Sequence, residues 1–446
     1  MAKTFSIISL GCPRNTVDSE KLISEFTAKG YIFKKESQSS DLLVINTCAF
    51  IEDAKKESID AILKVIDAKK NGDIKNIIVA GCLPQRYRDE LAKEFKEVDE
   101  FRGVMDFTPH PSLSPKGERV RVRGVRLTPK HYAYIKISEG CSHRCSYCAI
   151  PGIKGNYKSR DIESIKKEAN NFVKRGVKEI ILIGQDISLY GMDLYDVGAV
   201  SDRPLLANLL KKLAAISKDS WIRLLYLHPG NLDREIVRAM KNNKSICKYV
   251  DLPLEHINDR ILKQMGRKTT KKDITRLIEY IRKEIPWVAI RTSFIVGFPG
   301  ETEKEFKELL SFIKDMKFER LGVFKYSREE GTPAYGYKNQ IPEREKQKRF
   351  DKVMFLQQEV SREINEKFKG KVLKVLIEQK GRDYYEGRTE YDAPEIDGMV
   401  YVKGKDLRIG NFYDVKITDT YEYDLAGKTH PAALSAVRRI TQLDRG

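Results

Sequence analysis

The stretch YAYIKISEGCSHRCSYC (residues 132–148) decides how this chain is interpreted. An apolar strand pattern runs into a loop where three cysteines stand three and two residues apart: Cys141, Cys145 and Cys148. Three thiolates so close together can hold three irons of a 4Fe–4S cluster and leave the fourth iron open. Zinc is the alternative, but it needs four ligands, and His143 stands between two of the cysteines. The loop therefore predicts an iron–sulfur cluster.

An open iron implies a particular cofactor. It can chelate the amino and carboxylate groups of S-adenosylmethionine (SAM) and pass an electron into the sulfonium. The C–S bond then breaks and gives a 5′-deoxyadenosyl radical. Acid–base groups cannot activate an aliphatic C–H bond, so the hard chemistry belongs to the cofactor. The loop thus predicts a SAM site beside it.

A second group of cysteines is dispersed along the chain. Cys12, Cys48 and Cys82 each follow an apolar strand pattern: SIISLG, LLVINT and IIVAG. Parallel strands of an α/β sheet end at one edge, where ligands bind, so the three thiols should converge. Ordinary buried cysteines are the alternative. Convergence favours a second cluster with one iron free for a sulfur ligand, whereas Cys247 has no partner at ligand spacing and should be buried.

Composition limits the classes of protein that fit. The 446 residues are 41% apolar, which favours two or three domains and argues against disorder. Seven cysteines, an odd number, in a reducing compartment argue against a disulfide framework and for metal or redox chemistry. No apolar run approaches the roughly 20 residues of a membrane span. The expectation is a cytoplasmic protein with no membrane contact.

The order of patterns predicts an α/β chain with an added β-barrel. Residues 1–107 alternate strands and helices, as in a parallel sheet. Residues 108–129, rich in Pro, Ser, Gly and Arg, predict a basic linker or insertion, with an RNA contact as the alternative. Residues 130–368 fit a partial barrel of six strand–helix units with its site at the strands' carboxyl ends. Short strands over 369–430 predict a small antiparallel barrel, and 431–446 a tail.

The net charge of +18 is unevenly distributed. Residues 1–107 hold 17 basic and 18 acidic side chains, and residues 369–430 hold 11 and 12. Residues 130–368 hold 46 basic and 32 acidic side chains, so the excess lies in the centre of the chain. That excess could face RNA or simply keep the protein soluble.

Several stretches resemble the methylthiotransferases of the radical SAM superfamily, and the RimO branch in particular. They are SLGCPRNTVDSE, INTCAFIEDAKKESI, GCSHRCSYCAIPGIKGNYKSR, LIGQDISLYG, DLPLEHINDRILKQMGR and VGFPGETEKEF. Glu255 departs from the glutamine expected in the fifth stretch, and the insertion at 108–129 looks longer than the family needs. The resemblance implies an N-terminal methylthiotransferase domain, a central radical SAM domain and a C-terminal TRAM domain.

The resemblance also implies an activity. RimO-type enzymes add a methylthio group to the β-carbon of an aspartate in the decoding-centre protein of the small ribosomal subunit. The alternative is the sister branch similar to MiaB, which modifies isopentenyladenosine in tRNA and usually reads GCQMN rather than GCPRN. Two 4Fe–4S clusters, two uses of SAM and an electron donor such as flavodoxin or ferredoxin follow from the same resemblance.

The SAM pocket is expected at the carboxyl edge of the central barrel, with no catalytic residue beyond the cluster ligands. Its candidate residues are Tyr147, Gly184, Gln185, Asp186, Arg223, His228, Gly297 and Phe298. Tyr147 is expected to stack near the adenine. For the others a structural role is the alternative: a strand-end turn, a salt bridge, a capped turn or a helix start.

The substrate class is predicted from charge as well as resemblance. RNA binding demands a basic face, whereas residues 369–430 carry a net −1 and the acidic segment DTYEYD. This favours a basic protein partner, such as a ribosomal protein or the ribosomal subunit, over tRNA. A non-catalytic iron–sulfur carrier, or a radical SAM enzyme without sulfur insertion, would leave the strand-end cysteines without a use.

Overall fold

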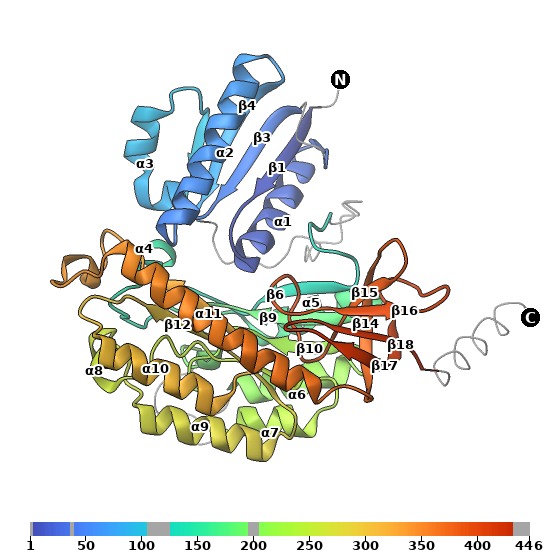
Figure 1. Cartoon of the computed structure of the whole chain (residues 1–446). Coiled ribbons are helices and arrows are strands. Elements are labelled where there is room, and N and C mark those ends of the chain that lie inside the picture. Colours follow the sequence, from blue (N-terminus) through green and yellow to red (C-terminus); the bar gives the residue numbers. More distant parts are fainter. Residues whose placement is uncertain (1–2, 36–39, 105–124, 195–204, 431–446) are drawn as a thin grey trace, which may run out of the picture.

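The computed structural model describes residues 3–35, 40–104, 125–194 and 205–430 (Figure 1). Most of the predicted insertion at 108–129 and all of the tail at 431–446 lie outside the described residues. The described chain forms an N-terminal parallel sheet, a central partial barrel and a small C-terminal barrel, which confirms the predicted fold class. The exact domain boundaries stay a prediction. No helix in the described ranges is long and apolar enough to cross a membrane.

The N-terminal part is a five-stranded parallel sheet of order β2-β1-β3-β4-β5. Its strands are β1 (Thr4–Ser9), β2 (Ile32–Phe33), β3 (Ser40–Thr47), β4 (Ile74–Gly81) and β5 (Glu100–Arg102). Three helices connect them: α1 (Pro13–Ala28), α2 (Glu52–Lys70) and α3 (Cys82–Glu94). Helices on both faces bury the central strands, which explains their continuous apolar runs. In this strand order ligands bind at the carboxyl ends, where the order reverses between β1 and β3.

The central part is a six-stranded partial barrel made of two parallel sheets, β10-β9-β6 and β11-β12-β13. A parallel bridge between Ile222 and Ile246 joins them. The strands are β6 (Tyr132–Lys136), β9 (Glu179–Ile183), β10 (Trp221–Leu224), β11 (Tyr249–Asp251), β12 (Ala289–Val296) and β13 (Arg320–Lys325). The outer helices are α5 (Ile162–Lys174), α6 (Leu205–Ile216), α7 (Arg234–Asn242), α8 (Asp259–Gln264), α9 (Lys271–Glu284) and α10 (Glu303–Met316).

Capping residues set where the outer helices begin. The Thr270 and Thr302 side chains accept hydrogen bonds from the third helical residue, Asp273 or Glu305, whose own side chain bonds back in a capping box. A short hairpin of β7 (Ser138–Glu139) and β8 (Lys158–Ser159) and the helix α4 (Ile150–Lys154) flank the predicted cysteine loop. The loop is therefore framed by regular structure on both sides.

The C-terminal part follows the long helix α11 (Glu343–Glu366) and is a closed barrel of order β14-β15-β16-β18-β17. Its strands are β14 (Val372–Lys380), β15 (Tyr385–Thr389), β16 (Val400–Lys403), β17 (Phe412–Thr420) and β18 (Leu425–Thr429). The pairs are antiparallel as predicted, except that β16 and β18 pair in parallel. Alternate side chains such as Val375, Ile377 and Val415 fill the interior.

This barrel is fastened to the amino ends of the central strands by buried ion pairs. Arg388 of β15 donates to Glu179, the first residue of β9, at 2.5 Å, and Arg223 donates to the same carboxylate at 2.6 Å. Tyr249, the first residue of β11, donates to Asp397 at 2.6 Å. The C-terminal barrel thus occupies one end of the central barrel, and the carboxyl end faces the N-terminal sheet (Figure 1).

Candidate active site

Three cysteines gather at the carboxyl edge of the N-terminal sheet, and we name them the sheet thiols: Cys12, Cys48 and Cys82. Cys12 caps α1, Cys48 follows β3 and Cys82 begins α3 after β4. A Cβ built on Gly11, whose φ is +86°, would stand 2.7 Å from the Cys48 Cβ. Only glycine there lets the chain carrying Cys12 approach Cys48 so closely.

Asn15 holds the strand ends that carry the sheet thiols. Its amide nitrogen donates to the carbonyls of Leu10 and Thr47, both at 2.9 Å, and so ties the end of β1 to the end of β3. Its side-chain oxygen lies 3.9 Å from the Cys82 sulfur. The Asn15 side chain therefore contacts the strand ends that precede Cys12 and Cys48, as well as the Cys82 sulfur.

The sheet thiols differ in their tendency to ionise. Burial raises the pKa of Cys48 and raises that of Cys82 to about 12, and negative charge on the neighbouring thiols adds to both shifts. Burial acts on Cys12 too, but the guanidinium of Arg14 outweighs it and holds the pKa of Cys12 below its usual range. Arg14 Nε donates to the Cys12 sulfur at 3.4 Å. A cation beside Cys12 thus favours the thiolate that binds metals.

The second group, which we name the loop thiols, consists of Cys141, Cys145 and Cys148. The backbone N–H of Cys141 donates to Gly155 at 3.1 Å, and that of Ser146 donates to Met265 at 2.9 Å. A Cβ on Gly140 would stand 2.1 Å from the carbonyl oxygen of Asn156, so the chain needs glycine there. Burial raises the pKa of Cys141 to about 11 and of Cys148 to about 12, with charge on the other loop thiols adding to it.

A cavity of about 350 Å³ lies beside the loop thiols and extends to residues next to the sheet thiols in sequence. All three loop thiols line it, together with Arg14, Phe50 and Ile51, which follow Cys12 and Cys48 in sequence. Its size is that of a small-molecule site. Tyr226 and Glu255 also line it and have φ values of 67° and 68°. Non-glycine residues in this region store strain that concentrates at functional sites.

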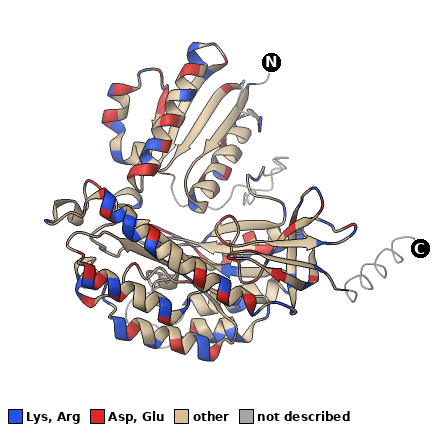
Figure 2. Cartoon of the chain, viewed as in Figure 1, with Lys and Arg blue, Asp and Glu red and all other residues tan. Residues whose placement is uncertain are grey.

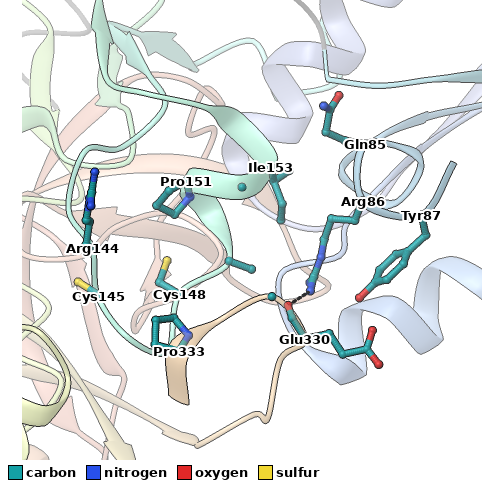
Figure 3. Close-up of a pocket in the computed structure, with 13 residues that line it drawn as sticks. Gln85, Arg86, Tyr87, Arg144, Cys145, Cys148, Pro151, Ile153, Glu330 and Pro333 are labelled. Carbon is teal, nitrogen blue, oxygen red and sulfur yellow. Dashed lines mark hydrogen bonds between the residues drawn. The ribbon is translucent and has the colours of Figure 1, made fainter. Parts of the chain in front are cut away.

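Two of the loop thiols also line a second cavity of about 500 Å³ (Figure 3). Figure 3 shows Cys145 and Cys148 facing this space from one side, with Arg86 and Tyr87 of the N-terminal part on the other. Arg86 spans the gap and donates to the Glu330 carbonyl at 2.9 Å. The cysteine loop is therefore a wall between two cavities.

Four of the residues predicted for the SAM pocket line the first cavity: Tyr147, Gln185, Asp186 and His228. Asp186 accepts hydrogen bonds from His143 at 2.7 Å and from Asn231 at 2.9 Å, and the His143 ring stacks on His228 at 4.2 Å. Burial and the charge of Arg267 lower the pKa of His228 to about 3, so its ring is neutral near pH 7. The Gln185 side-chain oxygen is buried without a partner among the described residues and can accept from a ligand.

Gly184 lies beside the cavity and its carbonyl accepts from Arg14 at 2.9 Å. The other three predicted residues lie outside it. Arg223 is fully buried against Glu179 and the C-terminal barrel, which is the salt-bridge alternative. Gly297, with φ +73°, packs closely on Lys346, and Phe298 is buried edge-on against the ring of Tyr326. Because Tyr326 lines the cavity, Phe298 supports the cavity wall from behind.

Cys247 is fully buried, as predicted, and belongs to a group of buried apolar side chains that includes Tyr249 and Trp221. The sequence reasoning missed Arg14, Tyr226 and Arg267. Arg14 carried a signal, because it stands two residues after Cys12 in the first turn of a helix.

A buried charge cluster fixes the N-terminal sheet on the central barrel. Lys136 of β6 donates to Asp18 of α1 and to Glu139 of β7, both at 2.6 Å, and Lys154 of α4 donates to Asp18 at 3.3 Å. Burial disfavours the Glu139 carboxylate, but the two lysines outweigh it and lower its pKa to about 2. Lys154 also faces Cys82 and Cys12. The cluster thereby sets the position of the sheet thiols relative to the loop thiols.

Three family models match the chain. The Radical SAM superfamily matches residues 135–313, the Uncharacterized protein family UPF0004 residues 4–103 and the TRAM domain residues 370–429. Among solved structures, the radical S-adenosylmethionine methyltransferase TsrM from Kitasatospora setae superposes with a TM-score of 0.55 at 13% identity, covering 86% of this chain and 81% of its own. That likeness shows the fold of the described parts.

Curated relatives match over nearly the whole length. "Ribosomal protein uS12 methylthiotransferase RimO" of Thermoanaerobacter sp. (strain X514) is 46% identical, covering 96% of this chain and 100% of its own. The protein of the same name from Bacteroides fragilis is 43% identical, covering 96% and 99%. With identity at this level over the full length, the chain belongs to the RimO family of radical SAM methylthiotransferases.

Proposed function

We propose that this chain adds a methylthio group to the β-carbon of an aspartate in ribosomal protein uS12. The observation that carries the proposal is a single cavity with the loop thiols on one side and residues flanking the sheet thiols on the other. The curated relatives are named for this activity on uS12. A tRNA methylthiotransferase would share the chemistry, whereas these relatives are named for uS12.

The side chains present fit two iron–sulfur clusters. Each group offers three thiols, and the nearest other donors are occupied: His143 bonds Asp186, and the Asn15 amide bonds two carbonyls. Three thiolates without a fourth protein ligand suit a 4Fe–4S cluster with an open iron better than a closed zinc site. Cys12, Cys48 and Cys82 would hold one cluster, and Cys141, Cys145 and Cys148 the other.

Clusters bound at these thiols would supply one-electron reduction of SAM and a place for the sulfur atom that is transferred. The side chains of the cavity would bind and orient SAM. Asp186 is held as a carboxylate by His143 and can accept from the amino group or ribose of SAM. Neutral His228 accepts from the Gly230 N–H at Nδ1, so its Nε2–H is a donor. Phe50 and Phe324 line the cavity with apolar surface that keeps water out.

The proposal that the substrate is a protein rests on the names of the relatives rather than on the charge of the C-terminal barrel. Many acidic residues of the C-terminal barrel are used inside the chain: Asp392 pairs with Arg320, and Asp397 with Arg291. Within DTYEYD, Glu422 pairs with Arg362. Lys and Arg alternate with Asp and Glu along the outer helices α9 to α11 (Figure 2). A flavodoxin or ferredoxin as electron donor, a contact with ribosomal RNA and a cytoplasmic location are parts of the proposal.

Mass spectrometry of ribosomal proteins and tRNA nucleosides, from cells with and without the gene, tests the proposal. The expected result is loss of the mass increment of SCH₃ replacing H on one aspartate of uS12. An unchanged uS12 with loss of methylthio-adenosine from tRNA would contradict it and favour the MiaB-like alternative.

A further inference from the structure

Arg14 is a cation in the cavity wall that forms no ion pair with a carboxylate of the described residues. Of the other two cationic side chains in that wall, Lys325 pairs with Glu343 at 2.5 Å, and Arg267 faces the buried carboxyl of Glu255. No carboxylate of the described residues lies within ion-pair distance of the Arg14 guanidinium. The negative charges that act on Arg14 are the Cys12 thiolate and, from farther away, the Glu139 carboxylate, so a ligand carboxylate in the cavity would be its first carboxylate in direct contact.

Three contacts fix the orientation of this guanidinium. Nε donates to the Cys12 sulfur at 3.4 Å, Nη1 donates to the Gly184 carbonyl at 2.9 Å, and the group lies 4.8 Å from the centre of the Tyr226 ring. Nη2 has no partner within the described ranges, although Arg14 lines the cavity. The side chain is therefore pre-organised, with one donor edge left for a ligand.

Arg14 also lies between the two groups of thiols. Its Nε lies 3.4 Å from the Cys12 sulfur of the sheet thiols, and its side chain lines the same cavity as all three loop thiols. A substrate atom that receives sulfur from one group, after activation beside the other, must pass through the same place. The mouth above it is apolar, because Phe50 and Phe324 are 38% and 51% exposed there.

We infer that Arg14 binds the carboxylate of the target aspartate and so selects the residue to be modified. This inference rests on the proposed function. A guanidinium edge suits a carboxylate, with which it forms short, charge-assisted hydrogen bonds. The β-carbon of an aspartate is bonded directly to its carboxyl carbon, so holding the carboxylate places the β-carbon between the thiols. Phe50 and Phe324 would contact the residues on either side of the target.

The test compares two labelled peptides that span the uS12 target, one with aspartate and one with asparagine at the target position. Their affinities for the cluster-loaded enzyme with SAM bound, but without reductant, are measured by fluorescence anisotropy. The wild-type enzyme should bind the aspartate peptide about 10-fold to 100-fold more tightly. Arg14→Gln should reduce that ratio to about threefold or less, and Arg14→Lys should retain part of it.

Lys325→Gln is the matched control, since it removes a cavity-wall charge that already has a partner, and the aspartate preference should stay. Iron content and SAM affinity are measured for each variant. Equal affinity of the wild-type enzyme for both peptides overturns the inference without any variant. So does an Arg14→Gln enzyme that loses SAM affinity but keeps the preference, because Arg14 would then serve SAM. Failure of the wild-type enzyme to methylthiolate uS12 would instead overturn the proposed function.

Discussion

The two groups of thiols are built in opposite ways. The sheet thiols come from three strand ends far apart in sequence, and their approach depends on the whole N-terminal sheet. The loop thiols come from residues 141–148, within one loop. The first group is therefore placed by the fold, whereas the second is placed by a short segment and its neighbours.

The backbone around each group differs accordingly. Cys12 and Cys82 stand at the first turns of α1 and α3, and the side chain of Ser58 bonds both the N–H and the carbonyl of Cys48. The loop thiols lie in irregular backbone outside helices and strands. The comparison teaches that the sheet thiols should keep their arrangement without metal, and that the loop thiols should depend on it.

Removing the iron should have the largest effect. Oxidation and chelation should abolish methylthio transfer, and reconstitution should restore it, because the thiols are the only chain groups proposed to hold the clusters. Hydrogen exchange should become faster over 140–157 and change little at 46–50 and 80–84. Equal loss of protection at both groups would contradict the comparison.

The second largest effect is expected from breaking the buried charge cluster of Lys136, Asp18, Glu139 and Lys154. Lys136→Met removes the cation that bonds Asp18 and Glu139 and leaves Lys154 alone to face both buried carboxylates, which should lower the free energy of unfolding by about 3–5 kcal/mol. Urea unfolding measures it. Lys166→Met, which breaks the exposed pair with Glu163, is the control and should cost about 1 kcal/mol at most. Equal costs would show that the cluster does not fasten the sheet to the barrel.

A third prediction concerns pH and the end of the barrel remote from the thiols. Burial raises the pKa of Glu378, but His131, which donates to it at 3.1 Å, and Arg388 outweigh burial and lower it to about 2. A lowered carboxyl pKa contributes stability above the ordinary value of about 4.5 and loses it as the pH falls toward about 2. The metal-free protein should therefore lose up to about 3 kcal/mol over that range.

Urea unfolding at about pH 5 and about pH 3 measures roughly half of this loss, because the rest falls between about pH 3 and the folded pKa. Glu378→Gln should be less stable at the higher pH and show a shallower dependence. An unchanged slope in the variant would mean that other carboxylates carry the effect.

The smallest effect is expected at Asn15. Asn15→Ala removes two hydrogen bonds that join strand ends and should cost about 2 kcal/mol. Iron bound at the sheet thiols should fall while iron at the loop thiols stays, as cluster spectra can distinguish. Ser142→Ala, which removes one exposed bond to the Tyr157 N–H, is the control for the loop. If Asn15→Ala lost iron at both groups of thiols, the two groups would not bind iron independently, and the comparison would be wrong.

The sequence predicted the convergence of Cys12, Cys48 and Cys82 because strand ends of a parallel sheet share one edge. It also predicted Asp186 and His228, which follow barrel strands. Arg223 was harder, since the third residue of a short strand can face either the cavity or the C-terminal barrel, and only the packed structure decides. Arg14 could have been found from its place two residues after Cys12, whereas Glu255 faces Arg267 and Tyr147 through the fold, which no local pattern reveals.

The division of labour between the two groups is tested most directly by two triple variants. Alanine at Cys12, Cys48 and Cys82 should abolish the methylthiolated uS12 peptide while cleavage of SAM to 5′-deoxyadenosine continues. Alanine at Cys141, Cys145 and Cys148 should abolish both products. Both are quantified by mass spectrometry. Methylthiolated peptide formed by the first variant would contradict the account, because the sheet thiols would then have no part in sulfur transfer.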